Sequence, residues 1–257
     1  MFVDSHCHID FPELSENING ILDNMREAQV THALCVSVNL TDWPRVLGLA
    51  EKYSNLFASV GVHPDHEIDE SEPSEHDLIR RADHPRIVAI GETGLDYYRL
   101  TGDLTWQRDR FRTHIRAALA CAKPLIIHTR AAAADTVAIM REENSGQVGG
   151  VMHCFTESWD VASAALDLGF YISFSGIITF KNAADLREVV RQVPLERLLI
   201  ETDSPYLAPV PYRGKTNQPA YVKHVAECVS QIKSVALEVV ADTTTKNFFK
   251  LFSNAKL

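Results

Sequence analysis

Four histidines and two carboxylates stand directly after short apolar runs in this chain. His6 and His8 occur in "DSHCHID", and "IGETG", "IIHTR", "VMHCF" and "ETDSP" supply the others: Glu92, His128, His153 and Asp203. Imidazole nitrogens and carboxylate oxygens bind zinc, manganese and other first-row divalent ions, and carboxylates also bind magnesium. The residue types therefore predict a divalent-metal centre.

Six candidate ligands exceed the need of one four-coordinate ion with an open position. We therefore predict two divalent metal ions (Mg2+, Mn2+ or Zn2+), with Glu92 as the candidate bridge and Asp203 as a second catalytic carboxylate. Paired ions of this kind activate a water molecule and stabilise a displaced oxygen. Their charge would outweigh the two carboxylates and attract an anionic substrate, although the chain has a net charge of −9.

The elements that must position these residues are short, nearly continuous apolar runs, which are typical of parallel strands covered on both faces. The predicted strands are Phe2–His6, Ala33–Val38, Phe57–Val62, Arg86–Gly91, Pro124–His128, Gly149–His153, Tyr171–Phe174 and Leu198–Glu201. Amphipathic segments with helical spacing lie between them, such as residues 17–29, 103–122 and 185–193.

Eight strands that alternate with helices predict an α/β protein with a (β/α)8 TIM barrel, formed by one domain over residues 1–257. An open doubly wound sheet is the alternative, but it usually has fewer strands. In a barrel, the carboxyl ends of the strands meet at one mouth, so residues far apart in sequence would form one site.

Strand alternation gives these side chains expected directions. His6 and His8 should point into the barrel, whereas Cys7, and by the same reasoning Cys154, should pack behind its wall. Asp4 and Glu201 should lie one layer deeper than His6 and Asp203, where they would orient a histidine ligand or serve as buried structural carboxylates.

The remaining histidines divide into two groups. His63 ends the third predicted strand and is expected to contact substrate, because the ligand set is already complete. The others are expected to be surface or structural residues: His32, His66, His76, His84, His114 and His224.

Composition sets further bounds on function. The acidic balance argues against a broad basic surface that follows duplex DNA, but not against local phosphate chemistry. We expect no membrane segment or secretory signal, and the five scattered cysteines favour reduced thiols in a cytoplasmic protein. The oligomeric state is open, with a monomer favoured.

The motifs "DSHCHID", "GVHPD", "GETGLDYYR", "HTR", "HCF", "ETDSPYLAP" and "RGKTNQP" together resemble the TatD family of metal-dependent hydrolases, in particular its YcfH-type branch, within the amidohydrolase superfamily. The resemblance implies deoxyribonuclease activity and metal ligation by the six residues named above. It also implies that His63, Arg130, Arg213 and Lys215 face the substrate. Ala131 departs from the acidic residue that family members often carry after "HTR".

The sequence thus favours hydrolysis of DNA or another phosphodiester, with single strands or strand ends as substrate and a 3'-5' exonuclease as one form of this activity. Two alternatives stay open: a metal-dependent amidohydrolase or phosphodiesterase that acts on a small molecule, and a catalytically silent binding protein. The intact ligand set argues against the silent protein, and the basic residues Arg130, Arg213 and Lys215 favour phosphate over neutral groups.

Overall fold

Apolar runs form the strands of this protein, and the amphipathic segments between them form helices. A computed structural model describes residues 1–66 and 72–256. Its strands are β1 (Phe2–Cys7), β2 (Val30–Cys35), β3 (Leu56–Val60), β4 (Ile87–Asp96), β5 (Leu125–Arg130), β6 (Gly150–Met152), β7 (Tyr171–Phe174) and β8 (Leu198–Ile200).

The helices follow the strands in alternation. They are α1 (Pro12–Ser15), α2 (Ile18–Glu27), α3 (Trp43–Lys52), α4 (Glu75–Ala82), α5 (Thr105–Cys121), α6 (Ala133–Glu142), α7 (Trp159–Asp167), α8 (Ala184–Gln192), α9 (Val222–Lys233) and α10 (Leu237–Leu251). Short 3-10 turns add η1 (Ser145–Gln147), η2 (Gly176–Thr179), η3 (Leu195–Arg197) and η4 (Pro219–Tyr221).

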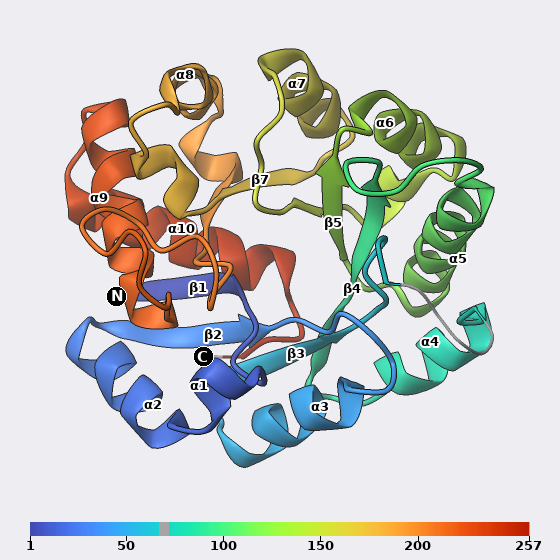
Figure 1. Cartoon of the computed structure of the whole chain (residues 1–257), viewed down its shortest axis with the longest axis horizontal. Coiled ribbons are helices and arrows are strands. Elements are labelled where there is room, and N and C mark those ends of the chain that lie inside the picture. The colour runs from blue at the N-terminus through green and yellow to red at the C-terminus, as the bar shows by residue number, and fades with distance from the viewer. Residues whose placement is uncertain (67–71, 257) are drawn as a thin grey trace.

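The strands form one parallel sheet in the order β1 to β8, and helices surround it on the outside (Figure 1). A parallel bridge between Cys7 and Ser204 joins the first strand to the chain that follows the last one. The predicted (β/α)8 barrel is therefore confirmed. The largest difference in strand bounds is at β4, which continues through Glu92 to Asp96 instead of ending at Gly91.

Two layers of apolar side chains hold the barrel together. The outer layer lies between strands and helices, and in α2, α3 and α4 its buried helical residues are four positions apart: Ile21 and Met25, Val46 and Ala50, Leu78 and Ala82. The inner layer fills the barrel with residues such as Val3, Leu34 and Leu199, and Phe248 and Phe252 of α10 join it. In the described part of the chain, no helix combines the length and apolarity that crossing a membrane requires.

The inner layer predicts that α10 contributes to stability. Replacing the fully buried Phe248 with Ala should lower the free energy of unfolding by about 3–5 kcal/mol, because it leaves a cavity at the end of the barrel. The melting temperature should fall by roughly 6–20 °C. Val239→Ala on the same helix, at a side chain that is 46% exposed, is the matched control and should change little. Equal melting curves for the two variants would contradict this role of α10.

Candidate metal centre

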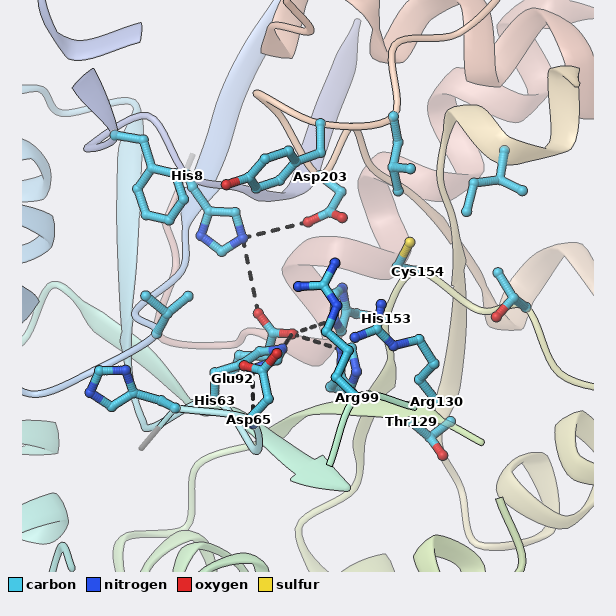
Figure 2. A pocket seen from close by; sticks show the side chains of 18 residues that line it. His8, His63, Asp65, Glu92, Arg99, Thr129, Arg130, His153, Cys154 and Asp203 are labelled. Carbon is cyan, nitrogen blue, oxygen red and sulfur yellow. Dashed lines mark hydrogen bonds and ion pairs between the residues drawn. The ribbon is translucent and has the colours of Figure 1, made fainter. Parts of the chain in front are cut away.

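The carboxyl ends of the strands enclose a cavity of about 600 Å³. It is lined by side chains from β4, β5 and the segments after β1, β6 and β8, including His8, Glu92, His128, His153 and Asp203 (Figure 2). The sixth candidate ligand, His6, is buried beside them, with its ring stacked on His153 at a centroid distance of 3.9 Å. The barrel thus brings together all six side chains that the sequence singled out.

The Glu92 carboxylate lies among four imidazoles. Its Oε1 is 2.7 Å from His153 Nε2, 3.1 Å from His128 Nδ1 and 3.3 Å from His63 Nε2. Its Oε2 is 3.3 Å from His6 Nε2. Burial alone would raise the pKa of Glu92, but His153 and His63 outweigh this effect and hold it well below its usual range. Glu92 is therefore an ionised carboxylate inside the barrel.

A second cluster adjoins Glu92 and consists of His6, His8 and Asp203. The Nε2 atoms of the two histidines are 3.2 Å apart, and Asp203 Oδ1 lies 3.5 Å from His8 Nε2 and 3.7 Å from His6 Nε2. Asp203 adopts a φ of +55°, a left-handed conformation that is costly for most residues other than glycine and is common at functional sites.

In four of these five histidines, the ring nitrogen that points away from the clusters faces an acceptor. The pairs are His8 Nδ1 with Val36 O at 3.0 Å, His63 Nδ1 with Asp65 at 2.5 Å, His128 Nε2 with Asp96 at 3.0 Å, and His153 Nδ1 with Glu201 at 3.3 Å. A carbonyl or carboxylate only accepts, so the outer nitrogen donates and the inner nitrogen of a neutral ring presents a lone pair. Metal-binding histidines are oriented in this way.

Carboxylates lie on both sides of these imidazoles, so their negative charge must be balanced by positive charge at the centre of the cluster. Burial alone would lower the pKa of His63, but Glu92 and Asp65 outweigh it and raise the pKa to about 9. The pKa of His153 is also raised, because Glu92 and Glu201 outweigh its burial. The raised pKa values place protons on these rings, and a divalent cation that displaced those protons would also bring positive charge to the centre.

The donor set fits divalent cations. Three groups of side chains have ligand atoms within 4.8 Å of one another: His6, His8 and Asp203; His6, His153 and Glu201; and His63, Glu92 and His128. Within the described residues, two buried atoms of these groups, His6 Nδ1 and Glu201 Oε2, also lack a hydrogen-bond partner. His63, which we expected to contact substrate, is thereby placed among the candidate ligands.

Irregular strand pairing turns His6 and Glu92 toward the candidate metal centre. Between Asp4 and Cys7, β1 has one residue more than the stretch of β2 with which it pairs. Between Ile90 and Thr93, β4 likewise has one residue more than the paired stretch of β5. Such bulges redirect side chains and are common beside active sites. Gly94 allows β4 to approach β5 closely, because its φ is +135° and a Cβ there would lie 2.0 Å from the His128 carbonyl oxygen.

The bulge in β1 corrects the expected position of Asp4. Val3 belongs to the inner layer, so Asp4 faces the other side and does not lie beneath the His6 imidazole. Its carboxylate accepts hydrogen bonds from the backbone N–H and hydroxyl of Thr202, at 2.8 and 2.5 Å, and from the backbone N–H of His6 at 3.3 Å. Asp4 therefore ties β1 to the segment after β8, as the buried structural carboxylate that the sequence left open as its second role.

Glu201 lies where the sequence predicts, one layer below Asp203. It is buried, faces His153 Nδ1 and accepts a hydrogen bond from the backbone N–H of Cys154 at 2.7 Å. Cys154 itself is not behind the wall. Its φ of +42° turns it toward the cavity, which it lines, whereas Cys7 packs in the outer layer as expected. Burial, together with Asp203 and Glu201, raises the pKa of the Cys154 thiol.

The basic residues divide into those inside the cavity and those outside it. Arg130, which is expected to face the substrate, lines the cavity, and so does Arg99, which sequence reasoning missed. Arg213 and Lys215 are exposed on the loop after β8 and are not among the lining residues. The Arg213 guanidinium instead lies 3.6 Å from the centroid of the Phe180 ring.

Asp96 is a further residue that the sequence did not reveal. It is buried at the end of β4, where its Oδ2 contacts both His128 Nε2 at 3.0 Å and an Arg130 guanidinium nitrogen at 2.6 Å. Burial alone would raise the pKa of Asp96, but His128 and Arg130 outweigh it and hold it well below the usual range. One carboxylate therefore orients both a candidate ligand and a candidate phosphate-binding residue.

Three buried polar residues of α5 form hydrogen bonds to the backbone after β3 and at the end of β4, next to the candidate site. The side-chain oxygen of Gln107 accepts a hydrogen bond from the backbone N–H of Asp96, and its side-chain nitrogen donates one to the Asp96 carbonyl. Arg110 donates to the carbonyls of His63 and His66, at 2.9 and 2.8 Å, and His66 itself lines the cavity. His114 accepts from the N–H of Val62 through Nε2 at 3.0 Å, and burial lowers its pKa to about 4. His114 is thus structural, as expected.

Asp96 should matter for metal binding. Asp96→Asn keeps the shape of the side chain but removes the charge shared by His128 and Arg130, so the affinity for Mn2+ should fall by about 10- to 100-fold. Isothermal titration calorimetry on metal-stripped protein measures the change. Asp135→Asn is the control, because Asp135 is half-exposed and bonds the Tyr97 hydroxyl instead of the cluster. Wild-type affinity in Asp96→Asn would refute the assignment.

His114 should make the fold sensitive to mild acid. The unfolded chain takes up a proton near pH 6.5, whereas folded His114 resists protonation until about pH 4, so stability should fall between these values. The loss should reach about 3 kcal/mol below pH 4. Urea unfolding at pH 4.5 and 7 should show a smaller pH effect in His114→Gln than in the wild type. Identical pH dependence would contradict a neutral buried histidine.

Comparison with known proteins places this geometry in a family. The chain matches the model of the TatD related DNase family over residues 3–253. It is 48% identical over 254 residues to the uncharacterized metal-dependent hydrolase YcfH of Escherichia coli K12, covering 97% of this chain and 95% of YcfH. It is 32% identical over 246 residues to the 3'-5' ssDNA/RNA exonuclease TatD of Edwardsiella piscicida, covering 93% and 95% of the two chains.

Solved structures agree with this placement. The fold superposes on the crystal structure of YjjV, a TatD homologue from Escherichia coli K12, with a TM-score of 0.90, 29% identity and 98% of each chain covered. A TatD family hydrolase from Entamoeba histolytica shares the fold at a TM-score of 0.87 and 24% identity, over 98% of this chain and 97% of that one. The chain therefore belongs to the TatD family of metal-dependent hydrolases.

Proposed function

We propose that this metal-dependent hydrolase cleaves phosphodiester bonds and acts as a deoxyribonuclease, with a 3'-5' exonuclease on single-stranded DNA as its specific form. The observation that carries the proposal is the opening of the carboxylate–imidazole cluster into a cavity that Arg99 and Arg130 also line. Guanidinium groups pair with phosphate oxygens in a fixed geometry. The name of the Edwardsiella relative supports the same reaction at 32% identity.

The candidate ligands divide into two neighbouring sets that suit two divalent ions. His6, His8 and Asp203 would hold one ion, and His63 and His128 the other, with Glu92 between them and His153 beside both. Divalent ions bound there would supply Lewis-acid stabilisation of phosphoryl oxygens and lower the pKa of a water ligand.

Two side chains of the protein, Asp203 and Arg130, would then take part in the reaction. Asp203 is 16% exposed at the cavity, and although burial alone would raise its pKa, His8 and His6 hold it below the usual range. An ionised Asp203 can accept the proton of the water that attacks phosphorus. Arg130, held by Asp96, would neutralise charge on the phosphoryl oxygens as the bond to the leaving oxygen breaks.

The shape and charge of the protein support single strands or strand ends as substrate. The site lies in a cavity among strand ends, and a loose end enters such a cavity more easily than the middle of a duplex. The net charge of −9 favours local contacts over a long electrostatic track. Five free cysteines fit a reducing, cytoplasmic setting for this activity.

A small-molecule amidohydrolase or phosphodiesterase is the second candidate. The same barrel and metal centre serve several chemistries, so the fold alone does not choose between them. The uncharged amide or lactone substrates of amidohydrolases would offer no anionic group to the two arginines of the cavity. The arginines thus favour a phosphate substrate, large or small.

The decisive experiment measures cleavage of labelled single-stranded and duplex DNA by the metal-loaded protein, beside a panel of small phosphodiesters and amides. Asp203→Asn should reduce cleavage of single strands by at least about 100-fold, because it removes the proton acceptor and a candidate ligand. Circular dichroism should show an intact fold. Asp23→Asn on the exposed face of α2 is the matched control and should retain full activity.

Metal dependence completes the test. Chelation should abolish cleavage, and adding back Mg2+, Mn2+ or Zn2+ should restore it. A rate that survives chelation, or full activity in Asp203→Asn, would contradict the mechanism. Turnover of amides without any cleavage of phosphodiesters would replace the proposal by the second candidate.

A further inference from the structure

Two highly exposed tyrosines stand beside the cavity. Tyr98 is 69% exposed and Tyr206 is 54% exposed, although aromatic rings contribute most to stability when they are buried. Tyr206 lines the cavity directly. Tyr98 lies under the guanidinium of Arg130, with 4.9 Å from the guanidinium carbon to the ring centroid. Tyr98 is therefore already paired with a cation, whereas more than half of Tyr206 is open to a ligand.

The backbone of Tyr206 is fixed relative to the metal centre. Its N–H donates to the carbonyl of Asp203 at 3.0 Å, and its own carbonyl accepts from the side-chain amide of Asn217 at 2.6 Å. Its ring meets Phe11 edge to face at 6.3 Å, and Phe11 stacks on the ring of His8 at 4.9 Å. A chain of aromatic contacts thus links Tyr206 to a candidate ligand.

The cavity has an apolar set and a cationic set of lining residues. Phe11, Tyr206 and Leu207 extend from the segments after β1 and β8, which carry His8 and Asp203. Arg99 and Arg130 extend from the ends of β4 and β5. Figure 2 shows His8 and Asp203 on one side of Glu92 and the two arginines on another. A nucleotide has the same division, with an apolar base face and an anionic phosphate.

We propose that Tyr206 is the platform on which the base of the terminal nucleotide stacks, while its phosphate turns toward Arg99 and Arg130. The inference rests on the proposed phosphodiesterase function and adds the recognition of a base. Stacking on an aromatic ring tolerates any sequence, because every base has a π-face. Tyr206 is a specificity residue in this scheme: it fixes the distance between the end of the strand and the bond that is cleaved.

The test compares single-stranded oligonucleotides that end in a normal nucleotide with otherwise identical ones whose terminal residue, at the 3' or the 5' end, is abasic. The wild type should cleave the normal end with a KM about 5- to 150-fold lower than that of the abasic end, the range expected for one stacked base. Tyr206→Ala should raise the KM for the normal end by a similar factor and lose the discrimination. Tyr206→Phe should keep both.

Controls separate stacking from general damage. Tyr206→Ala should cleave the abasic end with nearly wild-type kcat and KM, which a distorted site would not do. Val239→Ala removes another exposed apolar side chain, on α10, and should behave as wild type.

The outcomes distinguish the two proposals. If the wild type cleaves no phosphodiester at all, the proposed function fails. If it cleaves normal and abasic ends equally, or if Tyr206→Ala still discriminates between them, the function stands and the stacking role of Tyr206 is overturned.

Discussion

Glu92 places an ionised carboxylate inside the barrel, within 3.3 Å of four imidazole nitrogens, and the surrounding elements must accommodate that charge. A buried charge is tolerated only when it is paired and hydrogen-bonded. The bulge in β4 directs Glu92 inward, and Gly94 lets β4 lie close enough to β5 for His128 to reach the carboxylate. The imidazoles around Glu92 are in turn oriented by acidic residues farther from the centre. A shell of imidazoles thus lies between the Glu92 carboxylate and the outer carboxylates. This arrangement makes the cluster a receptor for cations.

The outer part of the arrangement depends on polar residues buried under α5. Gln107 bonds to backbone atoms at the end of β4, where Asp96 lies, and Arg110 bonds to the backbone after β3, where His63 lies. Each such group forms hydrogen bonds that water would otherwise supply, so its burial is compensated. The buried face of α5 carries both apolar and polar residues, so the helix packs against the barrel and also fixes the geometry of the backbone after β3 and at the end of β4. The same helix therefore contributes to the stability of the barrel and to the geometry of the candidate site.

Much of the fold and the position of the candidate ligands could be predicted from the sequence, because both depend on local patterns. Apolar runs locate the strands, and the polar residues directly after them locate the mouth, as with His128 and His153. Other features depend on contacts that no local pattern reports. Asp4 faces away from the cavity because of a bulge, and Cys154 enters it through a left-handed backbone conformation. Asp96 acquires its role only from the orientation of the His128 ring.

The junction between the first and last strands has a consequence for synthesis. Asp4 and its partner Thr202 are 198 residues apart in sequence, and the backbone of His6 and His8 bonds to Asp203 and Ser204. At ribosomal rates of about 5–20 residues per second, roughly 10–40 s separate the emergence of the two histidines from that of Asp203. Until Asp203 emerges, the nascent chain lacks one of the six candidate metal ligands. A metal centre built in this way cannot be complete until the segment that carries Asp203 has been synthesised.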